Sequence, residues 1–500
     1  MKRILRAIVL GALLSPLCSF AQDRANIIFL LTDDQSTSSV GSYGNPDVQT
    51  PQLDRLAGDG VSFDRYYTTT AICMASRATS MTGKYEYKTG CNFGHGDLLS
   101  SLWQQSYPVL LREAGYTTAF AGKFGFELRD APGGEKRGMP EGDFDRWGGG
   151  PGQTHYETAR NESMAAYAKD YPHSTRSYGA FGRDFIKDSA QGDAPFCLSI
   201  SFKAPHQPQR PDPIDDDVYA GKVFEKPDNY GRENGEHFSR QSRQGRQYTR
   251  FHDWHYSDEY DRVMATYYQQ VYAIDAAVGM IRDALVDAGV DDNTVIIFTS
   301  DNGFLNGSHG YGSKVLPYEE ASRVPMIIYD PRSANSGQAL RRDALAANID
   351  IAPTILSLAG LPIPQEMDGG DLMRVYEDPT AAIHESIALI NVWGAKPVQA
   401  MGVVTRDKKY LYWSYAAADF EATEELYNLA KDPSELANLA AQSDSRADLK
   451  AMRRIYDQHL ARWQSQAVSH HGYQLYSTYF DRSASWAEKA AVIAKSGENR

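Results

Sequence analysis

Four oxygen-bearing side chains follow two apolar stretches of the sequence and could together bind a metal ion. Asp33 and Asp34 come directly after ANIIFLLT, and Asp301 and Asn302 come directly after NTVIIFTS. Carboxylate and amide oxygens are the usual ligands of hard divalent cations, which favours Ca²⁺ and allows Mg²⁺. Asp and Asn at strand ends also cap helices and form turns. Two such pairs after two apolar stretches nevertheless predict a metal site.

A cysteine is the second feature with chemical potential. Cys73 stands in ICMASRATSMTGKY, and Arg77 follows it at the distance of one helical turn. A buried cysteine is usually just a small apolar residue. The rest of the sequence must therefore decide whether Cys73 is reactive.

The elements that must position these residues alternate along the chain. The apolar runs ANIIFLLT, YTTAFAGK, PFCLSISF and NTVIIFTS are typical of strands buried on both faces. Apolar residues spaced by three and four predict a helix in YYQQVYAIDAAVGMIRDALVDAG, with Gly289 placed to end it. This alternation predicts an α/β fold with a large, mostly parallel sheet sandwiched by helices. Ligands bind such sheets at the carboxyl ends of the strands, where the polar residues of these runs lie.

The sequence changes character towards its C-terminus. QAMGVVTRDKKYLYWSY predicts a hairpin, EELYNLA a further strand, and residues 445–463 a helix. We therefore expect a smaller antiparallel sheet with a helix against it. The predicted regions begin with a signal peptide at 1–21 and an N-terminal domain at 22–391. This domain contains an insertion at 205–260 that lacks clear structure. A small α+β subdomain at 392–470 and a C-terminal extension at 471–500 follow.

The first residues predict export to the periplasm or the medium. MKRILRAIVLGALLSPLCSFAQ has a basic start, a short apolar run and Ser19-Phe20-Ala21, which is typical of a signal peptide cleaved after Ala21. The run is too short to span a membrane, and no other stretch has the ~20 apolar residues that a spanning helix needs. A lipoprotein anchor at Cys18 is disfavoured because the preceding residues fit that signal poorly.

Composition sets further limits. A hydrophobic fraction of 42% is enough for a large core, and a net charge of −13 argues against general nucleic-acid binding. Removal of the signal peptide leaves Cys73, Cys91 and Cys197, an odd and sparse set that is not a disulfide framework. A Cys91–Cys197 bridge stays open, as does the oligomeric state.

Taken together, these motifs resemble those of the formylglycine-dependent sulfatases, within the alkaline-phosphatase-like superfamily. The resemblance spans about residues 24–465 and rests on LLTDDQ, CMASRATSMTGKY, AGKFG, KAPHQP, SDNG, GSHGYGSK and YEEASRVPMIIY. The Cys-x-Ala-x-Arg element with the following Thr-Gly pair is the most specific of them. The resemblance makes residues 22–391 the expected catalytic domain.

The resemblance implies that a maturation enzyme oxidises Cys73 to formylglycine, an aldehyde that hydrates to a geminal diol. One hydroxyl would attack sulfur, and the other would then expel sulfate, which is covalent catalysis in two steps. The cation would lower the pKa of the nucleophile and offset charge on the sulfate. The implied metal ligands are Asp33, Asp34, the residue at Cys73, Asp301 and Asn302.

Other positions match residues that act on sulfate in the family. Arg77 would fix the formylglycine, Lys123 and Lys314 would hold sulfate oxygens, and His206 would be the general acid at the leaving oxygen. His309 matches a second histidine beside the substrate. Two departures stand out: Ala75 replaces a common proline, which leaves the maturation system open, and Gly125 replaces a histidine that normally contacts the diol and sulfate.

The insertion carries a run of arginines and aromatic residues in SRQSRQGRQYTRFHDWHY. Arginines pair with sulfates and aromatic faces stack on sugars, so this stretch predicts a grip on a sulfated carbohydrate. An ordinary solvated loop is the alternative. The predicted substrate-binding arginines are Arg240, Arg243, Arg246 and Arg250.

The expected function is hydrolysis of sulfate esters on a sulfated polysaccharide or oligosaccharide, for example an algal galactan such as carrageenan. An aryl sulfatase, or a formylglycine-dependent phosphonate or phosphodiester hydrolase, is a second hypothesis. A non-catalytic glycan-binding relative, suggested by Gly125, is a third. The sequence leaves the sugar, the sulfated carbon, and exo or endo action undetermined.

Overall fold

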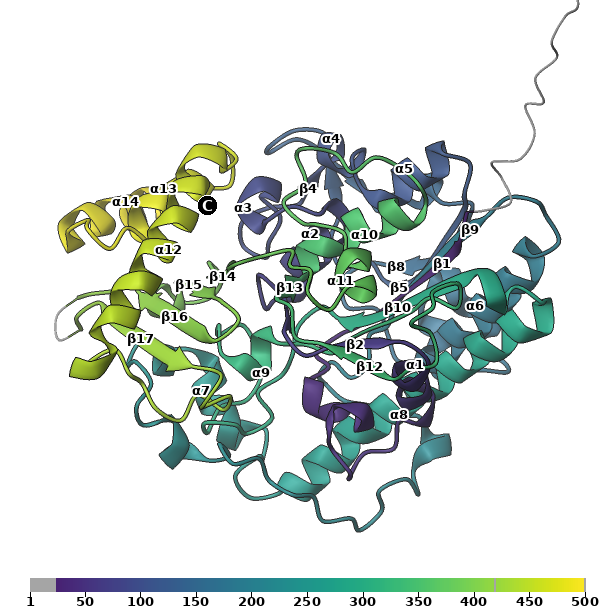
Figure 1. Cartoon of the computed structure of the whole chain (residues 1–500), viewed down its shortest axis with the longest axis horizontal. Coiled ribbons are helices and arrows are strands. Elements are labelled where there is room, and N and C mark those ends of the chain that lie inside the picture. Colours follow the sequence, from purple (N-terminus) through teal and green to yellow (C-terminus); the bar gives the residue numbers. More distant parts are fainter. Residues whose placement is uncertain (1–23, 418–419, 499–500) are drawn as a thin grey trace, which may run out of the picture.

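The computed structural model describes residues 24–417 and 420–498, so the predicted signal peptide and Cys18 lie outside the described residues. Its centre is an eight-stranded sheet (Figure 1). The strands, in spatial order, are β12 (Leu340–Arg342), β2 (Val61–Phe63), β11 (Met326–Tyr329), β10 (Thr294–Ser300), β1 (Asn26–Thr32), β9 (Phe196–Ser201), β5 (Thr117–Lys123) and β8 (Arg146–Gly150).

The sheet is mostly parallel, as the sequence predicts. β1 pairs in parallel with both β10 and β9, and its last residue, Thr32, is opposite Ser300. Only β11 runs antiparallel to its neighbours in this sheet. The ends of β1 and β10 therefore lie side by side, which brings the residues after Thr32 next to those after Ser300.

Both faces of the sheet are covered by helices, because successive side chains of a buried strand enter opposite cores. Ile27 and Phe29 of β1 pack in one core, and Ile28 and Leu30 pack in the other. Burial of each such side chain contributes about 1.5–3 kcal/mol. Figure 1 shows the helices of the first core, α2 (Cys73–Thr82), α5 (Tyr107–Glu113) and α10 (Ile351–Leu358), across the sheet from α1 (Pro51–Asp59), α6 (Ser174–Ser189) and α8 (Tyr260–Ala288).

The predicted long helix is α8, which Gly289 ends as expected. Gly289 has φ +67°, the left-handed conformation that glycine adopts without steric cost, and its N–H donates back into the last turn. The insertion before α8 is more ordered than predicted, because it contains the helix α7 (Arg246–Asp253). Cys91 and Cys197 are buried free thiols, so the bridge left open by the sequence is absent.

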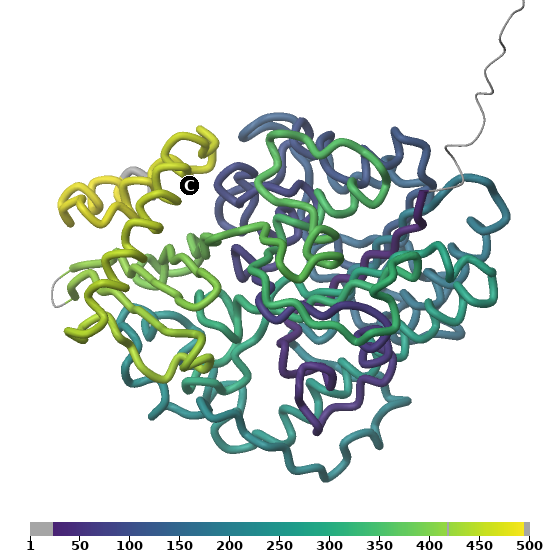
Figure 2. Tube along the Cα trace, viewed as in Figure 1, coloured from purple at the N-terminus to yellow at the C-terminus, as the bar shows by residue number. Residues whose placement is uncertain are grey.

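The C-terminal part forms a second, smaller layer, as predicted. β14 (Ile387–Asn391), β15 (Ala400–Val404), β16 (Lys408–Trp413) and β17 (Thr423–Asn428) make a four-stranded antiparallel sheet, and α12 (Arg446–Gln466) packs on it. This sheet begins at Ile387, before the boundary predicted at residue 392. The extension after residue 470 folds as α13 (Tyr473–Tyr479) and α14 (Trp486–Glu498). Figure 2 shows this last part of the chain, yellow-green to yellow, at one end of the molecule.

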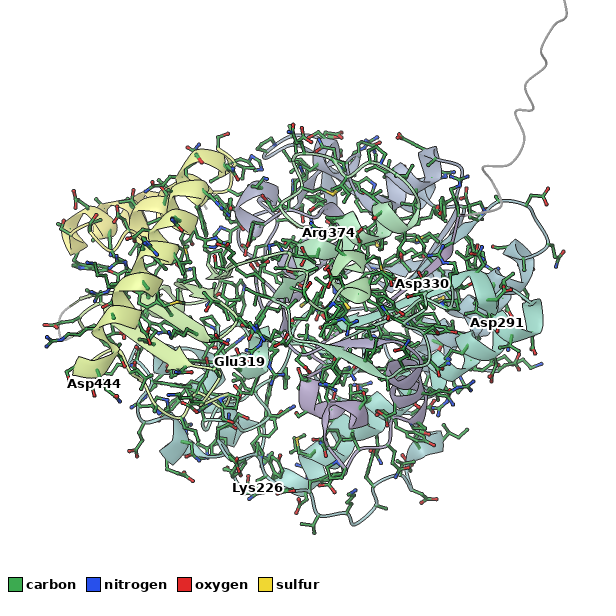
Figure 3. All side chains as sticks on the ribbon, viewed as in Figure 1. Lys226, Asp291, Glu319, Asp330, Arg374 and Asp444 are labelled. Atoms are coloured by element: carbon green, nitrogen blue, oxygen red, sulfur yellow. The ribbon has the colours of Figure 1, made fainter. Side chains whose placement is uncertain are left out.

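A buried ion cluster joins the two sheets. Glu319, in α9 (Glu319–Ser322), lies where they meet (Figure 3), and Lys409 of β16 is 2.7 Å from its carboxylate. Lys409 is also 2.8 Å from Glu435. Removal of one partner from such a buried group typically costs about 3–5 kcal/mol, so the cluster ties the small sheet to the large one. Within the described residues, no helix is long and apolar enough to cross a bilayer.

Candidate active site

The predicted carboxylates meet at the paired ends of β1 and β10. Oxygens of Asp33, Asp34 and Asp301 lie within 4.8 Å of one another, and all three side chains are buried. Asn302 Nδ2 donates to Asp34 Oδ1 at 2.7 Å, which adds the amide to the cluster. The parallel register of the two strands is thus what assembles the four residues.

This cluster fits a divalent cation. Asp33 Oδ1 and Asn302 Oδ1 are buried and accept no hydrogen bond. Both oxygens are therefore available to bind a metal ion. Burial, with the added charge of Asp33, raises the pKa of Asp301 to about 7. Buried carboxylates that crowd in this way repel one another, and a hard cation with oxygen preference would relieve that repulsion.

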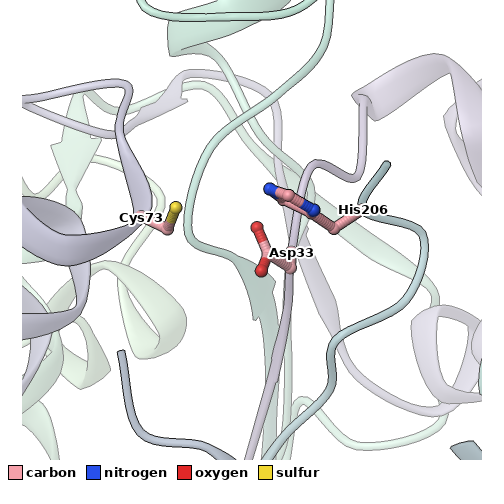
Figure 4. Close-up of side chains that lie close together, drawn as sticks. All are labelled: Asp33, Cys73 and His206. Atoms are coloured by element: carbon pink, nitrogen blue, oxygen red, sulfur yellow. The ribbon is translucent and has the colours of Figure 1, made fainter. Parts of the chain in front are cut away.

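Cys73 is the first residue of α2 and faces the cluster. Its sulfur, an oxygen of Asp33 and a nitrogen of His206 lie within 4.8 Å of one another, although the three residues come from different segments (Figure 4). Lys314 Nζ is 3.4 Å from Cys73 Sγ. Burial opposes ionisation of the thiol, but the charges of Lys123 and Lys314 outweigh it and lower the Cys73 pKa to about 5. The position at the start of α2 therefore favours an anion.

Arg77 reaches from α2 into the carboxylates and is fully buried. Its Nε donates to Asp301 Oδ2 at 2.7 Å, and its Nη2 is 3.5 Å from Asp33 Oδ2. Its Nη1 donates to the Lys123 carbonyl at 2.6 Å and to the Ser201 hydroxyl. Arg77 therefore fixes both aspartates and ties α2 to the ends of β5 and β9.

Two lysines approach the cluster, Lys123 from the end of β5 and Lys314 from a loop. Lys123, at the end of β5, donates to Asp33 and, at 2.7 Å, to Gln153. Lys314 donates to Asp34. Burial lowers the Lys314 pKa, but the negative charge of Asp34 outweighs burial and holds that pKa well above its usual range. The residues on either side of Lys314 have φ of +71° and +90°, a costly conformation for residues with a Cβ. The backbone is thus strained where it presents this lysine.

His206 lies at the open side of the site. Its Nε2 is 3.9 Å from Asp34 Oδ2, and Tyr156 Oη donates to its carbonyl at 2.6 Å. A cavity of about 300 Å³ opens beside it, lined among others by Asp34, His206, Arg246, Arg250, Trp254 and Lys314. A substrate in this cavity would contact the histidine, a lysine and a carboxylate of the cluster together.

The structure places His309 elsewhere, in contrast to the prediction that it lies beside the substrate. The imidazole is fully buried, with Nε2 3.0 Å from Asn229 Nδ2 and Nδ1 2.9 Å from the Asn234 carbonyl. It also packs on Phe238, with ring centroids 4.4 Å apart. These contacts give His309 a structural role, because they hold its own loop against the insertion.

The four predicted arginines separate into two pairs. Arg246 and Arg250 line the cavity. Arg243 instead donates to backbone carbonyls, at 2.6 Å to Glu236, and Arg240 lies 4.5 Å over the ring of Phe420. Only the second half of the predicted arginine run therefore borders the site.

Among the polar residues around the carboxylate cluster, Ser201, Gln153 and Lys203 were not predicted. Lys203 Nζ donates to the Gln153 carbonyl at 3.0 Å, and burial lowers the Lys203 pKa to about 8. Ser201 and Lys203 end the PFCLSISFK run, so their position at a strand end was a usable signal. Gln153 lies in a loop whose sequence gives no such signal.

The chain matches known proteins over most of its length. A model described as Sulfatase matches residues 25–361, and one described as N-sulphoglucosamine sulphohydrolase, C-terminal, matches residues 307–462. An N-acetylglucosamine-6-O-sulfatase of Bacteroides thetaiotaomicron is 26% identical over 87% of this chain and 86% of its own. An ulvan-active sulfatase of Formosa agariphila is 25% identical over 84% of this chain and 78% of its own.

A solved structure has the same fold with a bound sugar. That protein, in complex with its substrate D-glucosamine-2-N,6-O-disulfate, superimposes with a TM-score of 0.71 at 25% identity. The match covers 89% of this chain and 98% of the other. A match of that extent includes at least part of the smaller C-terminal layer.

Proposed function

The chain belongs to the sulfatase family and is a sulfuric ester hydrolase, and from this we propose that its substrate is a sulfated polysaccharide or oligosaccharide. The observation that carries the proposal is the arrangement at the start of α2, where Cys73 lies between two lysines, a histidine and the carboxylate cluster. The named relatives act on amino sugars and on ulvan, which supports a carbohydrate substrate. Glycosaminoglycans and algal galactans such as carrageenan belong to this class.

We further propose that Cys73 is converted to formylglycine, which supplies a nucleophile that can both attack sulfur and release sulfate. Asp33, Asp34, Asp301, Asn302 and the residue at 73 would hold Ca²⁺, or Mg²⁺ in its place. When bound, the cation would lower the pKa of the nucleophile and offset charge on the sulfate oxygens.

The remaining side chains orient the sulfate and handle the proton. Lys314 reaches Cys73 Sγ and Lys123 reaches Asp33, so their ammonium groups surround the position that sulfate oxygens must occupy. Arg77 holds the carboxylates in place rather than contacting the substrate. His206 borders the cavity and would protonate the departing sugar oxygen, a poor leaving group that needs a general acid.

Export and maturation complete the proposal. The leader would direct the chain to the periplasm or the medium, after a formylglycine-generating enzyme has acted on the Cys73 motif with its Ala75 variant. Residues 22–391 with the insertion at 205–260 would be the catalytic domain, followed by the subdomain at 392–470 and the extension at 471–500.

The test is a turnover screen of the mature protein on defined sulfated oligosaccharides, simple aryl sulfates and phosphonate monoesters, alongside intact-mass analysis for formylglycine. We expect formylglycine at position 73 and the highest kcat/KM on a sulfated carbohydrate. Preference for aryl sulfates or phosphonates would replace this proposal with the second hypothesis. Full conversion to formylglycine without turnover of any ester would favour a glycan-binding relative.

A further inference from the structure

Arg246 and Arg250 form a column on one face of α7. They are four residues apart, which places them on the same side of the helix, and Trp254 continues the column after the helix ends. All three line the cavity beside His206. The helix therefore presents two guanidinium groups and an indole to the space that the substrate enters.

No carboxylate of the described residues lies close enough to either arginine for a direct ion pair. Like charges four apart on a helix also destabilise it. Burial, with the charge of Arg246, lowers the Arg250 pKa to about 10, and burial also lowers the Arg246 pKa. Both groups are thus partly removed from water, and the charges of Asp34 and Asp253 do not fully offset that cost for Arg250. An anionic ligand in direct contact would offset more of it.

Aromatic rings hold both arginines in position. The Arg246 guanidinium lies 4.4 Å over the ring of Trp393, and that of Arg250 lies 4.1 Å over the ring of Trp254. Trp254 in turn stacks on Phe304, with ring centroids 5.9 Å apart. A planar guanidinium fixed in this way loses less freedom on binding and keeps its N–H groups for bidentate contacts.

Contacts through the loop at Ser313 and Lys314 connect Arg250 to Cys73. Arg250 Nη1 donates to Ser313 Oγ at 2.8 Å, and the next residue, Lys314, is 3.4 Å from Cys73 Sγ. The column therefore lies beside the sulfate that is cleaved, yet it uses side chains that the proposed chemistry does not involve. The proposed chemistry therefore leaves these side chains available for a second group of the substrate.

We propose that Arg246 and Arg250 form a subsite for a second anionic group, a sulfate or carboxylate on the sugar that carries the scissile sulfate or on its neighbour. The inference rests on the proposed carbohydrate sulfatase activity and narrows it to multiply charged substrates. Trp254 and Trp393 keep the two guanidinium groups in place at this subsite. The subsite selects the substrate, and the cluster around Cys73 cleaves it.

The test compares singly and doubly sulfated sugars by calorimetry on a Cys73→Ser background, which prevents turnover during titration. The probes are D-glucosamine 6-sulfate against D-glucosamine 2-N,6-O-disulfate, and galactose 6-sulfate against galactose 2,6-disulfate. We expect one doubly sulfated sugar to bind at least about tenfold more tightly than its singly sulfated partner, which corresponds to ~1.4 kcal/mol. Arg246→Gln/Arg250→Gln should abolish that difference, and added salt should reduce it.

The matched control is Arg240→Gln/Arg243→Gln, which removes the same charge from the same insertion but outside the cavity. This control should keep the preference for the doubly sulfated sugar. Equal loss in both double variants, or no preference in the parent protein, would overturn the inference. The proposed function is judged separately, by turnover with Cys73 intact: an enzyme that cleaves singly and doubly sulfated sugars equally well keeps its function and loses the subsite.

Discussion

A side chain at Gly125 would collide with Arg77. Gly125 has φ +95°, and a Cβ built there would lie 2.5 Å from Cδ of the arginine. Arg77 is the residue that ties α2 to Asp301, so space at Gly125 is a condition for that contact. The resemblance leads us to expect a histidine at position 125. In this chain the side chain of Arg77 occupies the space that a histidine side chain would need.

Restoring the expected histidine should harm this protein. Gly125→His forces Arg77 to shift and places a non-glycine residue at positive φ, a strain of about 1–3 kcal/mol. We expect a lower Tm and reduced kcat on any substrate. Gly133→Ala is the matched control, because Gly133 has φ +70° and open space around it. Similar losses in the two variants would show that the backbone, and not Arg77, is responsible.

Replacement of Cys73 should separate binding from turnover. In Cys73→Ser, the serine supplies one hydroxyl, whereas the proposed formylglycine diol supplies two. Without the second hydroxyl sulfate is not released, so kcat should fall by at least about 10³-fold. The Tm and substrate affinity should stay close to those of the parent protein. The variant is checked by single- and multiple-turnover kinetics beside calorimetry. Near-normal multiple turnover would contradict the proposed role of Cys73.

Removal of the cation should inactivate the enzyme and destabilise the fold. Without it, Asp33, Asp34 and Asp301 repel one another, and bound Ca²⁺ would add about 2.7 kcal/mol at a hundredfold excess over its Kd. Chelation should lower both the Tm and kcat, and added Ca²⁺ should restore both. Asp301→Ala should lose activity by at least about 10³-fold and lose the Ca²⁺-dependent rise in Tm. Full activity in protein shown by elemental analysis to be metal-free would refute the metal site.

The role of His206 predicts a dependence on the leaving group. A general acid matters most when the departing oxygen is a poor leaving group, and its loss typically costs about 10²–10⁴-fold. His206→Ala should therefore reduce kcat on a sugar sulfate by that range, but much less on an aryl sulfate with an acidic phenol. The measurement is kcat across a series of phenols and one sugar. A uniform loss over the whole series would indicate a binding role instead.

Acid should destabilise the C-terminal layer through His459. Burial, with the charge of Arg462, lowers the His459 pKa to about 4, so the unfolded chain takes up a proton near its ordinary value of 6.5 while the folded chain does not. The free energy of unfolding should thus decrease as the pH falls from about 6.5 to 4, by up to about 3 kcal/mol from this group. His459→Gln should flatten that dependence, which urea titrations across this pH range measure.

The sequence alone determined the architecture and the carboxylate cluster. ANIIFLLT and NTVIIFTS are continuous apolar runs, and only a strand covered on both faces buries such a run completely. Parallel strands end at the same edge of a sheet, so Asp33 and Asp301 were predictable neighbours, and the register of Thr32 opposite Ser300 confirms it. The smaller antiparallel sheet was predictable from the hairpin in QAMGVVTRDKKYLYWSY and the strand in EELYNLA, although its first strand was missed.

The tertiary structure decided which candidate side chains share the site. The sequence made His309 as good a candidate as His206, and Arg243 as good a candidate as Arg250. In the structure, His309 instead contacts Asn229, and Arg243 donates to backbone carbonyls. Sequence spacing gives the face of a helix but not the distance between segments that meet only in the folded chain. Trp393 illustrates this limit, because it reaches Arg246 from a loop more than a hundred residues away. Such contacts depend on how the two sheets pack, and no local pattern encodes that.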